Sequence, residues 1–185
     1  MDPVQTMLEV LARDPGDDAA WLVLADSLTE IGQTDRAELV RLQYTLRQPI
    51  VEQEKALEQR LLDLWSARVK PCLPERTGCL GMPFVLIPPG SFWMGTPRDE
   101  SWRDSDEDER HRVTLTRGFY LGKSAVTQEV WTEILGDNPS HHPVPMNPVE
   151  SVSYEDGIEF CERLTELLQA RCRLPTEAEW EYACR

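Results

Sequence analysis

The chain has 185 residues, of which 41% are apolar and 28% are charged, and its formal net charge is −14. This length is sufficient for one or two domains with a buried core, and the composition is ordinary for a globular protein. The acidic balance argues against a surface that binds nucleic acid or an anionic membrane, because such surfaces need clustered Lys and Arg.

Targeting signals are not evident either. The acidic start, MDPVQTMLEVLARDPGDD, has no apolar run of signal-peptide length, and no stretch approaches the roughly 18 apolar residues of a membrane span. We therefore expect a cytoplasmic protein whose partners include no nucleic acid and no membrane. The cysteines are odd in number and irregularly spaced, which favours reduced thiols over a disulfide framework. They are Cys72, Cys79, Cys161, Cys172 and Cys184.

Residues 1–70 are predicted to form a helical module, because apolar residues recur there at spacings of three and four. The first helix ends at the DPGDD sequence of residues 14–18, and Gly32 is placed to end the second as a left-handed C-cap. Asp35 and Glu38 predict a capping box for the third helix. The residues expected to face inward are Val4, Met7, Leu8 and Leu11, then Trp21, Leu22, Leu24, Ala25, Leu28 and Ile31, then Leu39, Leu42 and Leu46, and finally Leu57, Leu61, Leu64 and Trp65.

Two interpretations of this module stay open. AAWLVLADSLTEIGQTDRAELVRLQ has apolar and glycine positions of a tetratricopeptide unit, but no second copy follows at a spacing of about 34 residues. DPGDDAAWLVLADSLTEIGQTDRAELVRLQ, within residues 5–70, also resembles the repeat-companion segment found at the front of many bacterial multidomain proteins, from which Ser27 departs. That resemblance implies an accessory or docking role, whereas a plain packing module is the simpler interpretation.

Residues 71–82 are predicted to be a linker that precedes a second domain at residues 83–185. The sequence KPCLPERTGCLGMP has prolines and glycines without periodicity. Cys72 and Cys79 could supply two ligands of a zinc site, but no second pair and no histidine cluster completes it. We interpret both as linker cysteines.

The second domain begins with strand patterns. FVLIPPGSFWMG, residues 84–95, predicts a hairpin around Pro89-Gly90, and RVTLT with the following GFYLGK predicts two further strands. Separate helices follow without βαβ alternation. The predicted fold class is therefore α+β.

Three helices are expected in the remainder of this domain. Thr127 caps the first, which Gly136 closes, and Ser153 with Asp156 caps the second. The second helix is expected to bury Ile158, Phe160, Cys161, Leu164 and Leu168. RLPTEAEWEYACR starts the third, with Thr176 and Glu179 as its capping box and Trp180 packed back on the strands.

The acidic run DESWRDSDEDE contains Asp104, Asp106 and Asp108 at the alternate spacing of a calcium loop. It departs from an EF-hand because Glu109 and Leu115 stand where glycine and a bidentate Glu are needed. A solvated acidic loop is the prediction.

No other catalytic pattern is complete. His111, His141 and His142 could suggest a metal site, but adjacent histidines in a proline-rich loop point apart and no carboxylate lies at helical spacing. Cys184 lies beside Tyr182 in a helix and is interpreted as a buried structural thiol. GxSxG, a phosphate-binding loop and HExxH are not found. The residues alone predict no catalytic, cofactor-binding or metal-binding position.

Four segments resemble consecutive blocks of the formylglycine-generating enzyme, or sulfatase-modifying factor, family. They are FVLIPPGSFWMGTP, HRVTLTRGFYLGKSAVTQEVWTEILGDNPS, NPVESVSYEDGIEFCERL and RLPTEAEWEYACR. The resemblance covers about Met82–Arg185 and corresponds to the N-terminal part of the family domain. It implies that the helical module precedes a partial domain of C-type-lectin-like fold.

The resemblance also implies chemistry. Enzymes of this family oxidise a sulfatase cysteine to formylglycine with dioxygen and a copper ion held by two cysteines, and the complete domain also holds calcium. The copper-binding pair lies beyond the matched blocks, and none of the five cysteines matches it. Cys161 and Cys184 match positions that form disulfides with later cysteines in secreted relatives, so both are expected to be free here. His111, Thr127, Trp131, Asn147 and Trp180 match motif positions that we interpret as scaffold.

These implications predict a truncated family member that is inactive as given and holds no cofactor of its own, with a sulfatase or another protein as its partner. A non-catalytic binding module of C-type-lectin-like fold and a helical adaptor built on residues 1–70 are the alternatives. Half a domain is also expected to leave a large apolar patch uncovered. Its members would be Phe92, Trp93, Phe119 and Trp131.

Overall fold

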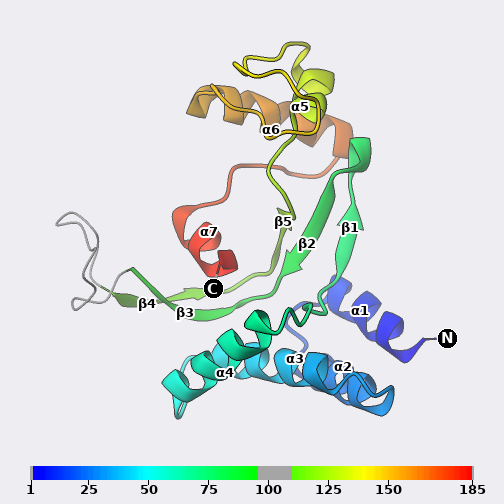
Figure 1. Ribbon diagram of the computed structural model, residues 1–185, viewed down its shortest axis with the longest axis vertical. Helices are drawn as coiled ribbons and strands as arrows, with labels where there is room; N and C mark the ends of the chain where they lie inside the picture. Colours follow the sequence, from blue (N-terminus) through cyan, green and yellow to red (C-terminus); the bar gives the residue numbers. More distant parts are fainter. Residues whose placement is uncertain (1, 96–109, 185) are drawn as a thin grey trace. The chain divides into compact units, whose positions relative to one another are not determined.

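The computed structural model describes residues 2–95 and 110–184 (Figure 1). The chain divides into two compact units that do not follow the order of the sequence. The first unit combines Met1–Pro74 with Leu86–Phe119 and Glu177–Arg185, and the second combines Glu75–Val85 with Tyr120–Thr176. Among the described residues, no helix has the length and apolar character needed to cross a membrane.

Four helices make up the start of the first unit, which confirms the helical module. They are α1 (Pro3–Arg13), α2 (Asp18–Glu30), α3 (Thr34–Leu46) and α4 (Glu54–Ser66). Asp2 and Asp17 each accept a hydrogen bond from a backbone N–H of the first turn, of α1 and α2 respectively. Gly32 has a φ of +78°, the left-handed conformation expected after the end of α2.

The predicted inward faces are largely confirmed. Leu11, Leu24 and Leu28 lie in one core of the module, and Leu39, Leu61 and Leu64 lie in a second. Leu22 and Ile31 were expected to face inward and are exposed instead. The capping box at Asp35 is also wrong, because the N-cap of α3 is Gln33, two residues earlier, and it makes no side-chain capping bond.

The strands form two small sheets. β2 (Pro83–Ile87) lies between β1 (Glu75–Thr77) and β5 (Phe119–Gly122), whereas β3 (Gly90–Met94) pairs antiparallel with β4 (His111–Leu115). β1 and the short 3-10 turn η1 (Cys79–Gly81) fall within the interval 71–82.

The predicted hairpin at residues 84–95 is therefore wrong, because β2 and β3 belong to different sheets. A two-residue hairpin loop needs a positive φ at its first central position, and proline at Pro89 fixes φ near −65°. Pro88 additionally removes a backbone donor where the ladder would begin. The two prolines instead separate the strands.

Contacts within the first unit join the helical module to β3 and β4. The backbone N–H of Ser91 donates to the carbonyl oxygen of Arg47 at 2.8 Å, and Trp93 Nε1 donates to Glu54 at 2.9 Å. Arg112 contacts Glu54 at 3.1 Å and also donates to the carbonyl oxygen of Gln48. A charged network around Glu54 thus holds the start of α4 against the strand pair.

The last helix, α7 (Glu177–Cys184), presents Tyr182 to this unit instead of Trp180. Tyr182 is 9% exposed and its ring centroid lies 5.1 Å from that of Phe92, while Trp180 is 59% exposed. Residues two apart on a helix point in nearly opposite directions, so only one of these side chains can face the strands. The expectation for Trp180 is wrong.

The second unit has its core between α5 (Gln128–Leu135) and α6 (Tyr154–Leu168). The Trp131 and Phe160 rings stack with a centroid distance of 5.1 Å, and Leu164 packs beside them. Thr127 caps α5, and Ser153 with Asp156 forms the expected capping box of α6. These elements confirm the α+β class.

Two further predictions about which residues are buried are wrong. Ile158 on α6 is exposed instead of buried. The predicted uncovered patch is wrong for Phe92 and Trp131, since both are almost fully buried in their own units.

Candidate functional site

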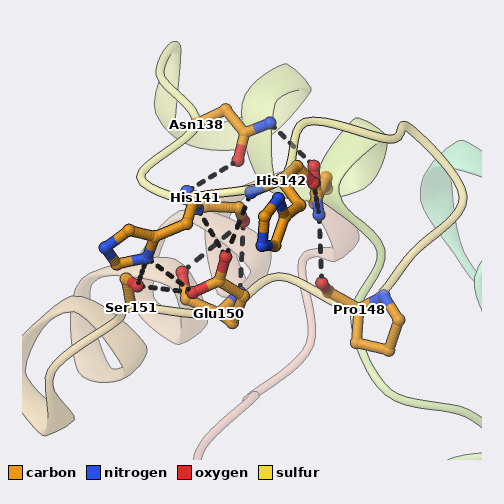
Figure 2. A network of polar contacts seen from close by, with 8 residues as sticks. Asn138, His141, His142, Pro148, Glu150 and Ser151 are labelled. Carbon is orange, nitrogen blue, oxygen red and sulfur yellow. Dashed lines mark hydrogen bonds and ion pairs between the residues drawn. The ribbon is translucent and has the colours of Figure 1, made fainter.

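The strongest concentration of polar contacts lies in the loop between α5 and α6 (Figure 2). This loop contains Pro139, Pro143, Pro145 and Pro148, which have no backbone N–H to donate. A loop of this composition cannot build a regular hydrogen-bond ladder of its own. A few backbone hydrogen bonds tie it to the start of α5, and side chains supply further contacts.

Gln128, the first residue of α5, supplies several of these side-chain contacts. Its side chain is 2% exposed, and Nε2 donates to the carbonyl oxygens of His142 and Pro148 at 3.1 and 3.3 Å. Oε1 accepts from Asn138 Nδ2 at 3.0 Å and from the Val144 N–H at 2.9 Å. One buried amide therefore satisfies four loop groups.

A second set of contacts joins the ends of the loop. Glu150 Oε1 accepts from the backbone N–H of His141, and from that of His142 at 3.4 Å. His141 Nδ1 lies 3.1 Å from Glu150 Oε2 and 2.7 Å from Ser151 Oγ, and Ser151 Oγ donates to Glu150 Oε2 at 2.5 Å. We call this set of His141, Glu150 and Ser151 the loop latch.

The electrostatics of the loop latch follow from these donors. Hydrogen bonds from the Ser151 hydroxyl first, and from the His141 side chain next, lower the pKa of Glu150 to about 2. The carboxylate is thus kept charged and serves as an acceptor. Ser151 has a φ of +63°, so its backbone is held in the left-handed region that non-glycine residues rarely adopt.

The loop latch does not have the geometry of a nucleophilic triad. In a Ser-His-acid relay the hydroxyl and the carboxylate contact opposite nitrogens of the imidazole, so that one proton is taken as the other is held. Here both groups contact Nδ1 of His141. The arrangement orders the loop and cannot relay a proton from Ser151 to Glu150 through the ring.

Sequence reasoning missed both Gln128 and Glu150. It considered only carboxylates at helical spacing from the histidines, yet Glu150, nine residues beyond His141, reaches it across the loop. No periodic signal could have revealed this contact, because it joins two ends of an irregular loop.

The other candidate ligands are not brought together. His111 lies in β4, away in sequence from the loop histidines, and the described residues contain no group of three or more His, Cys, Asp or Glu side chains placed to hold a metal ion. Asp104, Asp106 and Asp108 lie outside the described residues.

The cysteines are all free, and they occupy different environments. Cys72 is buried in the core of the helical module, and burial raises the pKa of its thiol. Cys79 and Cys172 pack against the Trp131–Phe160 core. Cys184 is exposed on α7, so the expectation of a buried thiol there is wrong.

The residues carried over from the family motif fall into two groups. Thr127 caps α5, Trp131 is in the core, and the Asn147 carbonyl oxygen accepts from the Gln128 N–H at 2.9 Å. These three support the domain. Trp180, by contrast, presents its ring to solvent.

Comparisons with known proteins agree with the resemblance seen in the motifs. The chain is 29% identical, over an alignment of 153 residues, to the formylglycine-generating enzyme of Mus musculus, covering 55% of this chain and 39% of that protein. It is 39% identical over 77 residues to the chaperone protein LppX of Paenibacillus barcinonensis, covering 42% of this chain and 24% of the relative. Its structure is similar to that of PvdO from Pseudomonas aeruginosa, with a TM-score of 0.53 and 28% identity over 58% of this chain and 49% of that one.

The chain therefore spans less than half the length of each of these relatives. Residues 74–185 match the family described as the sulfatase-modifying factor enzyme 1-like domain. Because this match covers more than half of the chain, the protein belongs to the sulfatase-modifying factor, or formylglycine-generating enzyme, family.

Proposed function

We propose that residues 74–185 act as the scaffold part of a formylglycine-generating-enzyme-like domain and that residues 1–185 by themselves do not catalyse the family's oxidase reaction. In this proposal the copper-binding pair has no counterpart in residues 1–185. The proposal concerns the oxidase reaction alone and leaves the domain free to contact a sulfatase or another protein.

The state of the thiols is the observation that carries this proposal. Copper is held by thiolates, which form readily only where nearby positive charge or hydrogen bonds lower the thiol pKa. Burial instead raises the pKa values of Cys72, Cys161 and Cys172. Burial therefore disfavours the thiolate form at these three positions.

The test is direct. The purified chain is incubated with Cu(I), dioxygen, a thiol reductant and a cysteine-containing peptide from a sulfatase, and aldehyde is trapped with a hydroxylamine reagent. We expect no trapped aldehyde, whereas a complete formylglycine-generating enzyme under the same conditions gives it. Trapped aldehyde that depends on this chain and on copper would refute the proposal.

A non-catalytic binding role is the second candidate, because the ordered loop presents apolar side chains to solvent. Met146 is 72% exposed and Tyr154, just beyond the loop, is 68% exposed. A rigid loop that displays such residues costs little entropy when a partner covers it. Saturable binding of a peptide or glycan by a monodisperse sample would support this role, and loss of that binding in Met146→Ser would localise it.

The helical adaptor hypothesis has less support. Its α3–α4 edge is already used within the chain, since Arg47, Gln48 and Glu54 contact β3 and β4. A partner would have to bind another face of the module.

A further inference from the structure

Two cysteines of the second unit meet around one hydroxyl group. Thr165 Oγ1 lies 2.9 Å from the carbonyl oxygen of Cys161 and accepts a hydrogen bond from the backbone N–H of Cys172, also at 2.9 Å. It lies 3.3 Å from the carbonyl oxygen of Cys172 as well. The backbones of Cys161 and Cys172 therefore both contact a single oxygen atom.

The helix geometry places Cys161 underneath the returning chain. Gly157, Cys161 and Thr165 follow one another at intervals of four along α6, so they share one face of the helix. A Cβ atom at Gly157 would lie 3.5 Å from Leu174 Cδ1. Residues 172–174 thus run back along this face, from Thr165 toward Gly157, and Cys161 lies between these two contact points.

Both thiols are partly withdrawn from solvent, and Cys172 acts on the ionisation of Cys161. Burial is the main cause that raises the pKa of Cys161, and the neighbouring Cys172 raises it further. Burial also raises the pKa of Cys172, which a hydrogen bond from Thr165 partly offsets. Both side chains are half-buried, and both cysteines are free.

Cys79 is the competing partner, because burial is the main cause that raises the pKa of Cys172 and Cys79 raises it further. It lies in η1, outside α6, whereas Cys161 lies on the α6 face along which residues 172–174 run, and both Cys161 and Cys172 contact the hydroxyl of Thr165. A disulfide needs Cα atoms about 4.4–6.8 Å apart. The hydrogen bond from the Cys172 N–H to Thr165 Oγ1 places Cys172 beside the turn of α6 that follows Cys161.

We propose that Cys161 and Cys172 form a dithiol site that reacts with low-molecular-weight disulfides and closes to an intramolecular disulfide. The Cys172 thiolate attacks one sulfur of the small disulfide and expels one small thiolate, which leaves a mixed disulfide on Cys172. The Cys161 thiolate then attacks the Cys172 sulfur and expels the second small thiolate. The protein pair loses two electrons and two protons, and the small disulfide gains them as two thiols.

The experiment uses the full chain and oxidised glutathione at mildly alkaline pH, with thiol titration and peptide mapping by mass spectrometry. We expect the number of free thiols to fall from five to three, with no glutathione retained and with one peptide linking Cys161 to Cys172. Cys161→Ser should instead retain glutathione on Cys172. Cys79→Ser is the matched control and should form the linkage as the wild-type chain does.

Three results would overturn the proposal: a Cys79–Cys172 linkage, glutathione adducts without any linkage, or five thiols that remain free. Since the mapping is done on the wild-type chain, it is decisive even if the Cys161→Ser chain does not fold. The oxidase proposal is unaffected by any of these outcomes, because the copper and aldehyde assay does not depend on this pair.

Discussion

The two compact units are stabilised by different kinds of interaction. In the first unit, the helical module meets β3 and β4 through a charged network in which Glu54 binds both Trp93 and Arg112. In the second unit, aromatic stacking between α5 and α6 forms the core, and the neutral amide of Gln128 orders the loop above it. High salt, and substitutions that remove a charge, should therefore lower the stability of the first unit selectively. Substitutions that remove apolar volume or the buried amide should lower the stability of the second.

The largest effect is expected in the aromatic core of the second unit. Trp131→Ala removes the ring that stacks on Phe160, and an unfilled cavity of this size lowers the free energy of unfolding by about 3–5 kcal/mol. Trp180→Ala is the matched control, because that ring is exposed and its loss should change stability by only about 0.5 kcal/mol or less. Urea unfolding monitored by circular dichroism measures both. Equal effects would contradict the packing described here.

The second-largest effect on stability is expected from the buried side-chain amide of Gln128. Gln128→Leu keeps the size of the side chain but leaves the loop groups that it contacts without a partner, which should cost about 2–3 kcal/mol. Amide hydrogen exchange of Val144 should become faster, because its N–H donates to Gln128 Oε1. The neighbouring, exposed Glu129→Gln should leave that exchange rate unchanged. Unchanged exchange in Gln128→Leu would show that the loop is ordered by other contacts.

A smaller effect is expected in the charged network of the first unit. Glu54→Gln removes the charge that Arg112 contacts, and both side chains are mostly buried, so the loss should be about 1–2 kcal/mol. Glu58→Gln, which affects only a 3.8 Å pair with Arg110, should cost a few tenths of a kcal/mol. The difference between the two variants should shrink in high salt, because ions screen the pair. A difference that is independent of salt would argue against an ionic network.

The smallest effect is the pH dependence of the loop latch. The folded-state pKa of Glu150 is lowered from 4.5 to about 2, so the stabilisation is fully present above 4.5 and is lost as the pH falls toward 2. Nuclear magnetic resonance of the Glu150 side chain should show this titration midpoint, and the amide signal of His141 should shift with it. Glu150→Gln should abolish the shift. A midpoint near 4.5 in the wild-type chain would mean that the latch does not form.

Much of the fold could be predicted where the signal is local. The caps at Thr127 and Ser153 and the left-handed Gly32 depend on residues within four positions, and all three were found. The hairpin at residues 84–95 was not, because strand pairing depends on partners far along the chain. The choice between Trp180 and Tyr182 likewise depends on Phe92, which a helix pattern alone cannot reveal.

The candidate site was less predictable than the fold. The family motifs identified the domain, but the loop latch rests on Glu150 reaching His141 across an irregular loop, which leaves no periodic trace in the sequence. The contact between Cys172 and the turn of α6 near Cys161 was equally hard to predict, because it depends on residues 172–174 turning back along α6. In both places the sequence pattern does not reveal which segments contact one another in the folded chain.

The mass of a sulfatase-derived cysteine peptide after incubation with the copper-loaded chain and dioxygen tests the central claim most directly. Our account predicts a peptide of unchanged mass once its thiol is reduced. A peptide whose cysteine has become an aldehyde, formed only when this chain and copper are both present, would contradict it.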